Sequence, residues 1–272
     1  MKEPYLTRFK QLILSGSASR DIHDAGDGPG APGRGGERAS AAFLMREVDR
    51  VRMHTAGLCV LLADHIATAA MVLDVGCGTG GTTVALALSA LAPKQVIGVD
   101  ADVSTLEAAE VRALGHDLEP QKVSFQHVPA GEPLPFASAS FDLVTCVSVL
   151  EFITLPAARE RFIRELLRVL RPGGYLFLAT PSPFRLRDYH SHRFLGDWRR
   201  TPGHPWATPP WVIARWLHGH ERVPLAVYRV RRRRALRFAG PFAGLLQWAF
   251  PWQQWLVIKR EEPQSESGAG TG

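Results

Sequence analysis

A cluster of glycines between a short apolar run and a helical pattern constrains this chain more than any other feature. Residues 72–75 (Val-Leu-Asp-Val) are typical of a buried strand, and residues 76–81 (Gly-Cys-Gly-Thr-Gly-Gly) hold four glycines in six positions. Glycine lacks a Cβ, so such a turn can adopt positive φ angles and let a ligand lie against the backbone. A helix that starts here would also point free N–H groups at a negatively charged ligand group. The sequence therefore predicts a nucleotide-type cofactor site.

Further along the chain, apolar runs typical of strands alternate with patterns typical of helices. This alternation favours a doubly wound α/β fold, with a parallel sheet and right-handed crossovers, whose ligand lies at the carboxyl ends of the strands. Ser104 and Glu107 have the spacing of a capping box at one helix start. Helices are also expected at 37–66, 82–88, 156–170 and 211–218. Strands are expected at 71–75, 95–100, 122–127, 141–147, 175–180, 225–232 and 252–259.

The chain is expected to form one domain with less ordered ends. Residues 1–36 are predicted to be a flexible N-terminal segment, because 15–36 is rich in Gly, Ser, Pro and Asp, and 261–272 is predicted to be a disordered tail. Residues 37–260 would form the domain, with insertions at about 181–210 and 235–250 that cover the substrate site.

Composition narrows the class of protein and its setting. The chain has 272 residues, 46% of them hydrophobic, which is enough for one large core. Three cysteines make no disulfide framework, and no apolar run reaches the roughly 18 residues of a membrane span, so a cytoplasmic location is expected.

The net charge of +6 is concentrated late in the chain. Between Arg185 and Arg237 there are thirteen arginines against three acidic residues. A basic region of this kind can meet nucleic acid, anionic lipid or an acidic substrate, or it can be a solvated face whose arginine stems lie along the surface.

Two cofactor classes are compatible with the glycine turn. Gly76, Gly78 and Gly81 have the spacing of a dinucleotide fingerprint, and Asp100 follows about 20 residues later, where an acid would bind a ribose. Both cofactor classes need a glycine turn and a carboxylate for ribose hydroxyls, so this match alone does not separate them.

A longer series of motifs is more specific. It consists of residues 73–80 (Leu-Asp-Val-Gly-Cys-Gly-Thr-Gly), 98–100 (Gly-Val-Asp), 134–136 (Leu-Pro-Phe) with 140–144 (Ser-Phe-Asp-Leu-Val), 149–151 (Val-Leu-Glu) and 168–174 (Arg-Val-Leu-Arg-Pro-Gly-Gly). In this order the series resembles the class I S-adenosylmethionine-dependent methyltransferase family, over about residues 72–180. The resemblance implies a seven-stranded, mostly parallel sheet whose last strand is antiparallel.

The resemblance also implies a cofactor, S-adenosyl-L-methionine, and residues that would bind it. Asp74 and the backbone at Gly76 and Gly78 would hold the methionine end, Asp100 would accept hydrogen bonds from the ribose hydroxyls, and Ala101 would pack on the adenine. Gly80 could instead serve only helix–strand packing. The full predicted cofactor site is Asp74, Gly76, Cys77, Gly78, Gly80, Asp100, Ala101, Gly131 and Val147.

Two positions depart from the family pattern. The acid that often meets the adenine amino group would fall near Ala130 and Gly131, so adenine would be held by the backbone or by the neighbouring Glu132. Many relatives have histidine after the Leu-Glu pair, whereas this chain has Phe152. The second change removes a polar group from the pocket mouth and favours an apolar acceptor.

Methyl transfer from a sulfonium needs a general base only for an acceptor that is protonated at the working pH. His190 and His192 are the candidate bases, because they follow the fifth strand where the chain should cover the pocket. No metal is expected. Cys146 is interpreted as a core residue, and residues 145–148 (Thr-Cys-Val-Ser) lack the tetrad of enzymes that methylate base amino groups, which disfavours nucleic acid.

The expected function is therefore methyl transfer to oxygen or carbon of a small, apolar or lipid-linked metabolite. The apolar residues 235–250 next to Arg231–Arg234 suit such an acceptor and a peripheral membrane contact, although they could simply close the core. The alternatives are a nucleic-acid methyltransferase, a nicotinamide oxidoreductase and a catalytically silent binding protein with this fold.

Overall fold

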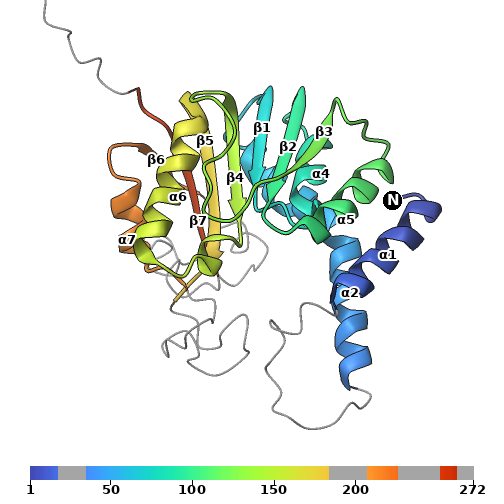
Figure 1. The fold of residues 1–272 in the computed structure, drawn as a ribbon. Helices are drawn as coiled ribbons and strands as arrows, with labels where there is room; N and C mark the ends of the chain where they lie inside the picture. The colour runs from blue at the N-terminus through green and yellow to red at the C-terminus, as the bar shows by residue number, and fades with distance from the viewer. Residues whose placement is uncertain (18–34, 184–206, 226–251, 262–272) are drawn as a thin grey trace, which may run out of the picture.

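A seven-stranded sheet forms the centre of the computed structural model, which describes residues 1–17, 35–183, 207–225 and 252–261, without the side chains of 16–17, 35–42 and 252 (Figure 1). The strands are β1 (Met71–Val75), β2 (Gln95–Asp100), β3 (Val123–His127), β4 (Phe141–Val147), β5 (Leu170–Pro181), β6 (Glu221–Val223) and β7 (Trp252–Ile258). The helices are α1 (Glu3–Ser17), α2 (Gly35–His54), the π-helical η1 (Thr55–Cys59), α3 (Val60–Ala63), α4 (Gly81–Ala87), α5 (Val103–Leu114), the 3₁₀-helical η2 (Leu150–Phe152), α6 (Pro156–Val169) and α7 (Pro210–Trp216).

The strand order is β3-β2-β1-β4-β5-β7-β6. The strands from β3 to β5 pair in parallel, and β7 pairs antiparallel with both β5 and β6. The predicted doubly wound α/β fold with an antiparallel last strand is thus confirmed. This order places the carboxyl ends of β1, β2 and β4 side by side, which is where a ligand of such a sheet is expected.

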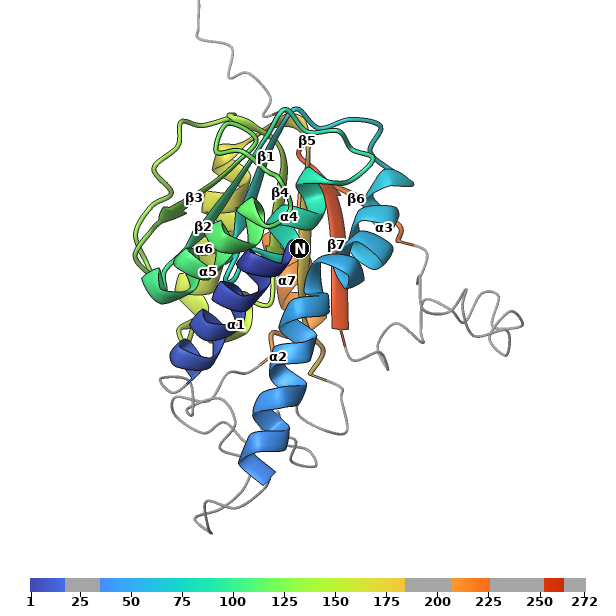
Figure 2. The ribbon, with the colours of Figure 1, turned by 90° about the vertical axis from the view of Figure 1, so that its right-hand side faces the viewer.

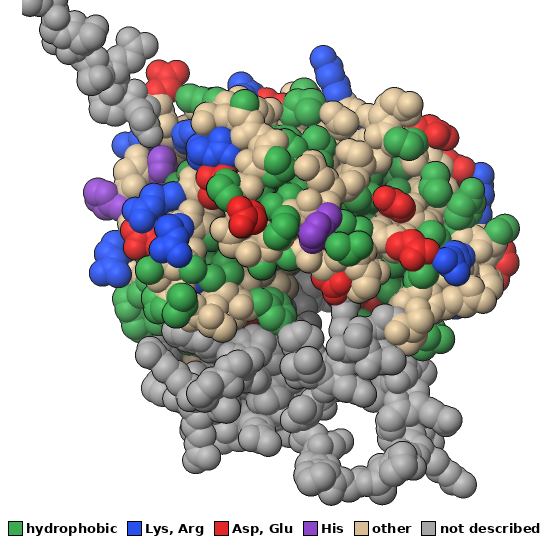
Figure 3. All heavy atoms as spheres, viewed as in Figure 1, with side chains coloured by type: hydrophobic (Ala, Val, Ile, Leu, Met, Phe, Trp, Pro, Cys, Tyr) green, Lys and Arg blue, Asp and Glu red, His purple; other side chains and the backbone are tan. Residues whose placement is uncertain are grey.

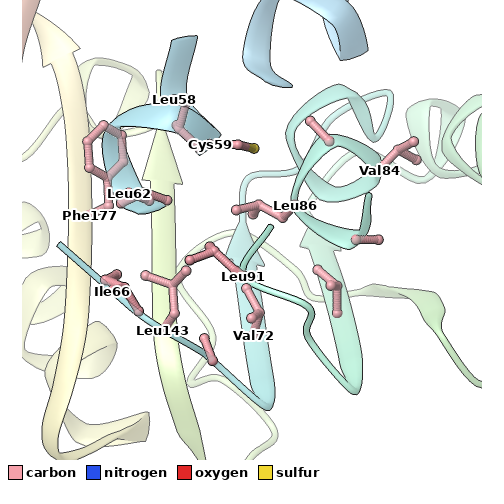
Figure 4. Packing of buried hydrophobic residues seen from close by; sticks show 14 of the residues in the cluster. Leu58, Cys59, Leu62, Ile66, Val72, Val84, Leu86, Leu91, Leu143 and Phe177 are labelled. Carbon is pink, nitrogen blue, oxygen red and sulfur yellow. The ribbon is translucent and has the colours of Figure 1, made fainter. Parts of the chain in front are cut away.

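The core lies on both faces of the sheet, because its central strands are apolar at consecutive positions. Val72 of β1 and Leu143 of β4 belong to a cluster beneath α2, η1, α3 and α4, part of which Figure 4 shows. The next residues, Leu73 and Val144, belong to a cluster beneath α6 and α7. Helices therefore cover both faces, as Figures 1 and 2 show.

The N-terminal helix α1 corrects one expectation. Residues 1–36 were expected to be flexible, but residues 3–17 are helical and lie along α5 (Figure 2). Phe9 is fully buried and Ile13 nearly so, in a cluster with Ala108 of α5. These apolar side chains recur at helical spacing among polar neighbours, and their burial against α5 orders the helix. Residues 18–34 and 262–272 lie outside the described residues.

Two other local predictions need correction. The cap of α5 is Asp102, whose carboxylate accepts the Ser104 N–H at 2.9 Å, so Ser104 and Glu107 form no capping box. The strand expected at 175–180 is longer, because β5 begins at Leu170, directly after α6, and includes residues 171–174. β6 at Glu221–Val223 is an additional strand that was not expected, and the strand expected at 225–232 lies, apart from Leu225, outside the described residues. The other described elements agree with the predicted ones to within a few residues.

None of the helices in the described part of the chain combines the length and the apolar character that a bilayer crossing requires.

Candidate cofactor site

The glycine turn after β1 has the left-handed backbone that its sequence predicts. Gly76, Gly78 and Gly80 have φ angles of +74°, +51° and +76°. The N–H groups of Gly76 and Cys77 both donate to the Val99 carbonyl on β2, at 2.8 and 3.0 Å, and the Gly80 N–H donates to the Cys77 carbonyl at 2.9 Å. These main-chain bonds fix the position of Gly76 and Cys77 against β2 and close the turn at Gly80.

Two of these glycines are also required by close packing. A Cβ at Gly76 would lie 2.0 Å from Val149 Cγ2, and one at Gly80 would lie 2.9 Å from the Ala109 Cβ. A Cβ at Gly78 would meet no atom of the described residues within 4 Å. The turn therefore packs against the protein at its two ends, and its middle faces open space that a ligand could fill.

Asp100, at the end of β2, lies directly beside this turn. Its Oδ2 accepts the Gly78 N–H at 2.6 Å and its Oδ1 accepts the Asp102 N–H at 2.9 Å. An ionised carboxylate has about four acceptor positions, so two remain after these bonds. Asp100 can therefore accept a pair of hydroxyl groups while it stays fixed to the turn.

Asp74 lies beneath the turn on the α4 face of the sheet. Its side chain is buried, its Oδ2 accepts the Thr83 hydroxyl at 2.7 Å, and its Oδ1 accepts the Thr145 hydroxyl at 2.8 Å. Burial raises the pKa of Asp74 to about 6, although both hydroxyls favour the ionised form. The hydrogen bonds described for Asp74 join it to Thr83 and Thr145. Its contact with the cofactor's methionine end stays a prediction.

The remaining predicted cofactor residues surround the same edge of the sheet. Cys77 is buried, and burial raises the pKa of its thiol, so this residue would contribute backbone and not a thiolate. Ala101 is exposed, and its carbonyl lies 3.2 Å from His127 Nε2. Gly131 has a φ of +89° and open space at the Cβ position. Val147, half-buried, ends β4.

A network of buried polar side chains lies at the carboxyl ends of β4 and β5, and sequence reasoning missed it. Glu151 Oε2 accepts the Thr180 hydroxyl at 3.1 Å. Arg159 of α6, which is 1% exposed, donates to the Ile153 carbonyl at 2.6 Å and to the Thr208 hydroxyl at 2.7 Å. Arg159 sits in a charged stretch of an amphipathic helix, so its sequence gives no signal that it is buried.

Gln253 of β7 completes this network. Its Nε2 donates to the carbonyls of Pro181 and Thr208, at 3.1 and 2.8 Å. Pro181 ends β5, and Thr208 precedes α7, so one amide joins two chain positions that flank residues 184–206. The candidate bases His190 and His192 fall in that range, outside the described residues, and stay predictions.

Three further side chains lie near the sheet. Cys146 is fully buried, and burial raises the pKa of its thiol, so it is the core residue that was expected. Asp142, near the start of β4, accepts the Met71 N–H at 2.7 Å and pairs with Arg171. Phe152 is 43% exposed beside the carboxyl end of β4.

Within the described ranges there is no group of three His, Cys, Asp or Glu side chains that could hold a metal.

The residues of this edge fit S-adenosylmethionine. The open space at Gly78 and Gly131 admits a ligand close to the backbone, and the two unused acceptor positions of Asp100 suit the vicinal hydroxyls of a ribose.

The molecular face drawn in Figure 3 carries positive, negative and hydrophobic side chains interspersed, without one dominant charge.

Comparisons with known proteins agree with this geometry. The family model described as a methyltransferase domain matches residues 73–178. A ubiquinone biosynthesis O-methyltransferase of Psychrobacter arcticus is 35% identical over 124 residues, 43% of this chain and 46% of that protein. A 27-O-demethylrifamycin SV methyltransferase of Amycolatopsis mediterranei is 36% identical over 147 residues, 53% of this chain and 50% of that protein. The chain thus spans about half the length of the curated relatives it matches.

Solved structures show the same fold at lower identity. An S-adenosylmethionine-dependent methyltransferase of Mesorhizobium loti superposes with a TM-score of 0.50 at 17% identity, covering 75% of this chain and 100% of that one. The [4+2]-cyclase SpnF superposes with a TM-score of 0.52 at 21% identity, covering 75% of this chain and 81% of that one. The chain therefore contains a methyltransferase domain at residues 73–178, and its sheet has the fold of S-adenosylmethionine-dependent methyltransferases.

Proposed function

We propose that this protein transfers a methyl group from S-adenosylmethionine to an oxygen atom of a small molecule. The observation that carries the proposal is the contact between the turn after β1 and the end of β2. There the Gly78 N–H, in a turn of left-handed glycines, donates a hydrogen bond to the carboxylate of Asp100. The family match supports the cofactor, and the two relatives described above, one named as an O-methyltransferase, support small-molecule methylation.

The cofactor would supply a methyl group already activated on a sulfonium sulfur. The chain's own part is then to position the reactants and exclude water. Asp100 would hold the ribose, and the backbone of Gly76 and Gly78 would lie against the methionine part. The carboxyl ends of β4 and β5 would bring the acceptor to the methyl group, and their buried side chains would keep that edge rigid.

The acceptor is proposed to be an apolar phenol or alcohol, such as one that carries a long hydrocarbon chain. Phe152, exposed beside the carboxyl end of β4, adds apolar surface where a polar residue is common in relatives. A phenol has a pKa of about 10 and is protonated at neutral pH, so it would need a base, for which His190 or His192 is proposed. Contact with a membrane surface and a cytoplasmic location are further parts of this proposal.

Calorimetry with S-adenosylhomocysteine, the demethylated product, tests the cofactor half of the proposal. We expect saturable binding to the folded protein and no binding of NADH. Absence of heat with S-adenosylhomocysteine, from a protein whose circular dichroism shows it folded, would contradict the proposal and favour the catalytically silent alternative.

Transfer of a labelled methyl group from S-adenosylmethionine tests the acceptor half. The acceptors should be one phenol with a long isoprenoid chain, the same phenol without the chain, and an RNA. We expect the chain-bearing phenol to have the higher kcat/KM and the RNA to remain unlabelled. Preference for the unsubstituted phenol would remove the lipid-like acceptor, and labelling of RNA with a steep salt dependence would favour a nucleic-acid methyltransferase.

A further inference from the structure

We infer that the N-terminal helices position the cofactor turn through one buried cluster, Glu47, Thr79 and Arg112, so that cofactor affinity depends on the docking of α1 and α2. This inference rests on the proposed function, because it concerns the turn that would hold S-adenosylmethionine. Thr79, Glu47 and Arg112 come from the turn, α2 and α5 respectively, and all three side chains are buried.

The Thr79 side chain is the point where the turn meets the helices. Its hydroxyl donates to Glu47 Oε2 at 2.6 Å and accepts from Arg112 Nη2 at 3.0 Å. Thr79 stands between Gly78 and Gly80, both with positive φ, so its own backbone is flanked by the two most permissive positions of the turn. A hydroxyl held from two sides therefore restrains a stretch that its glycines would otherwise leave free.

Arg112 anchors the cluster to both N-terminal helices. Its guanidinium donates to the Glu47 carbonyl at 2.9 Å, lies 3.3 Å from Glu47 Oε2, and stacks 4.3 Å above the ring centre of Phe9 on α1. Burial lowers the pKa of Arg112 to about 10, so the side chain is charged at neutral pH. A buried charge must keep its partners, so displacement of α1 or α2 would disturb Arg112 and, with it, Thr79.

The opposite side of the same turn would meet the cofactor. The Gly78 N–H, next to Thr79, is the group that donates to Asp100, the proposed ribose ligand. Thr79 thus connects the turn to α2 and α5 through its hydroxyl, and Asp100 connects the same turn to β2 through the Gly78 N–H. Coupling between two sites is reciprocal, so a bound cofactor should stabilise the docking of α1 and α2 as much as their docking favours the cofactor.

The first test compares Thr79→Val, which keeps the side-chain shape without the hydroxyl, with Thr79→Ser, which keeps the hydroxyl. We expect Thr79→Val to weaken S-adenosylhomocysteine binding about tenfold, as for a lost hydrogen bond between a hydroxyl and a charged group, and Thr79→Ser to stay within about twofold of the unaltered protein. For methyl transfer, Thr79→Val should raise the KM for S-adenosylmethionine about tenfold and leave kcat within about twofold. Arg52→Ala is the matched control, because Arg52 is an exposed residue of α2 that pairs only at the surface with Asp49; its binding should be unchanged.

The second test measures amide hydrogen exchange in α1 and in residues 43–54 of α2 with and without S-adenosylhomocysteine. In the unaltered protein the ligand should slow exchange in both helices, and in Thr79→Val, at saturating ligand, this slowing should be lost. Binding of Thr79→Val equal to that of the unaltered protein, or undiminished slowing in this variant, would overturn the inference and leave the proposed function standing. Absence of binding by the unaltered protein would overturn both.

Discussion

The two halves of the sheet edge are built by different means. At the carboxyl ends of β1 and β2, the shape comes chiefly from main-chain bonds and left-handed glycines, with Asp100 attached to the backbone and Thr79 as the side chain that ties the turn to the helices. At the carboxyl ends of β4 and β5, it comes from buried side chains, chiefly Glu151, Arg159 and Gln253.

The difference matches what each half would bind. A cofactor shared by a whole family can be held by backbone groups, which every residue type supplies. An acceptor that differs between family members needs side chains, which can change without loss of the turn. The fold alone leaves the chemistry open, since a [4+2]-cyclase shares it at low identity.

The largest effect is expected from Gly76→Ala, which attacks the backbone half. The left-handed φ and the 2.0 Å approach of its Cβ to Val149 together should lower the free energy of unfolding by about 3 kcal/mol and weaken S-adenosylhomocysteine binding at least about tenfold. Urea denaturation and calorimetry measure the two quantities. Gly57→Ala, whose Cβ would meet no described atom within 4 Å, is the control; it should leave binding unchanged and raise the free energy of unfolding by at most about 1 kcal/mol, because alanine favours a helix more than glycine does. Normal binding by Gly76→Ala would contradict the view that left-handed glycines determine the shape of this half.

Asp74→Asn tests whether a charge is buried beneath the turn. Because burial raises the pKa of Asp74 from 3.8 to about 6, the folded protein keeps a proton between these pH values that the unfolded chain has released. The free energy of unfolding contributed by this group therefore falls as pH rises through the window, by up to about 3 kcal/mol. The side chain of Asp74→Asn cannot titrate. Between pH 4 and pH 7 the free energy of unfolding of this variant should therefore rise, relative to that of the unaltered protein, by up to this amount.

Urea denaturation of both proteins at the two pH values provides the measurement. A stability difference between them that is the same at pH 4 and pH 7 would mean that Asp74 titrates alike in the folded and unfolded chains.

Arg159→Met attacks the side-chain half. The variant loses the hydrogen bonds that a buried cation donates to Ile153 and Thr208. Its free energy of unfolding should therefore be lower by about 2 kcal/mol. S-adenosylhomocysteine affinity should stay within about twofold, because these contacts lie outside the glycine turn. Arg164→Met on the same helix removes only an exposed pair with Glu160 and should cost about 0.5 kcal/mol or less. A large loss of cofactor affinity in Arg159→Met would show that the two halves are not independent.

The smallest effect is expected from Asp100→Asn, which keeps the shape of the side chain and removes its charge. Hydrogen bonds from ribose hydroxyls to a carboxylate are stronger than those to an amide, so S-adenosylhomocysteine binding should weaken about tenfold. The amide keeps one oxygen that can accept the Gly78 or the Asp102 N–H but not both, so the free energy of unfolding should fall by about 1 kcal/mol. Asp117→Asn, at an exposed position paired with Lys2, is the control. Equal binding by Asp100→Asn and the unaltered protein would place the ribose elsewhere.

Sequence reasoning succeeded where local rules decide the structure. The turn at 76–81, the strands β1 to β5 and the alignment of their carboxyl ends follow from glycine's freedom at positive φ and from unbroken apolar runs. Sequence reasoning failed at α1, where Phe9 becomes buried only because α5 offers an apolar face. It also failed at the start of α5, where Asp102 and not Ser104 is the residue that caps the helix.

The sequence by itself determined the backbone of the cofactor edge, because glycines and apolar strands act through neighbours in the chain. Only the tertiary structure decided which charged residues are buried. Glu47 and Arg112 are 65 positions apart, and each looks like an ordinary solvent-facing residue of its own helix. Burial of a charge depends on a partner brought from elsewhere in the chain, and that information is absent from any local pattern.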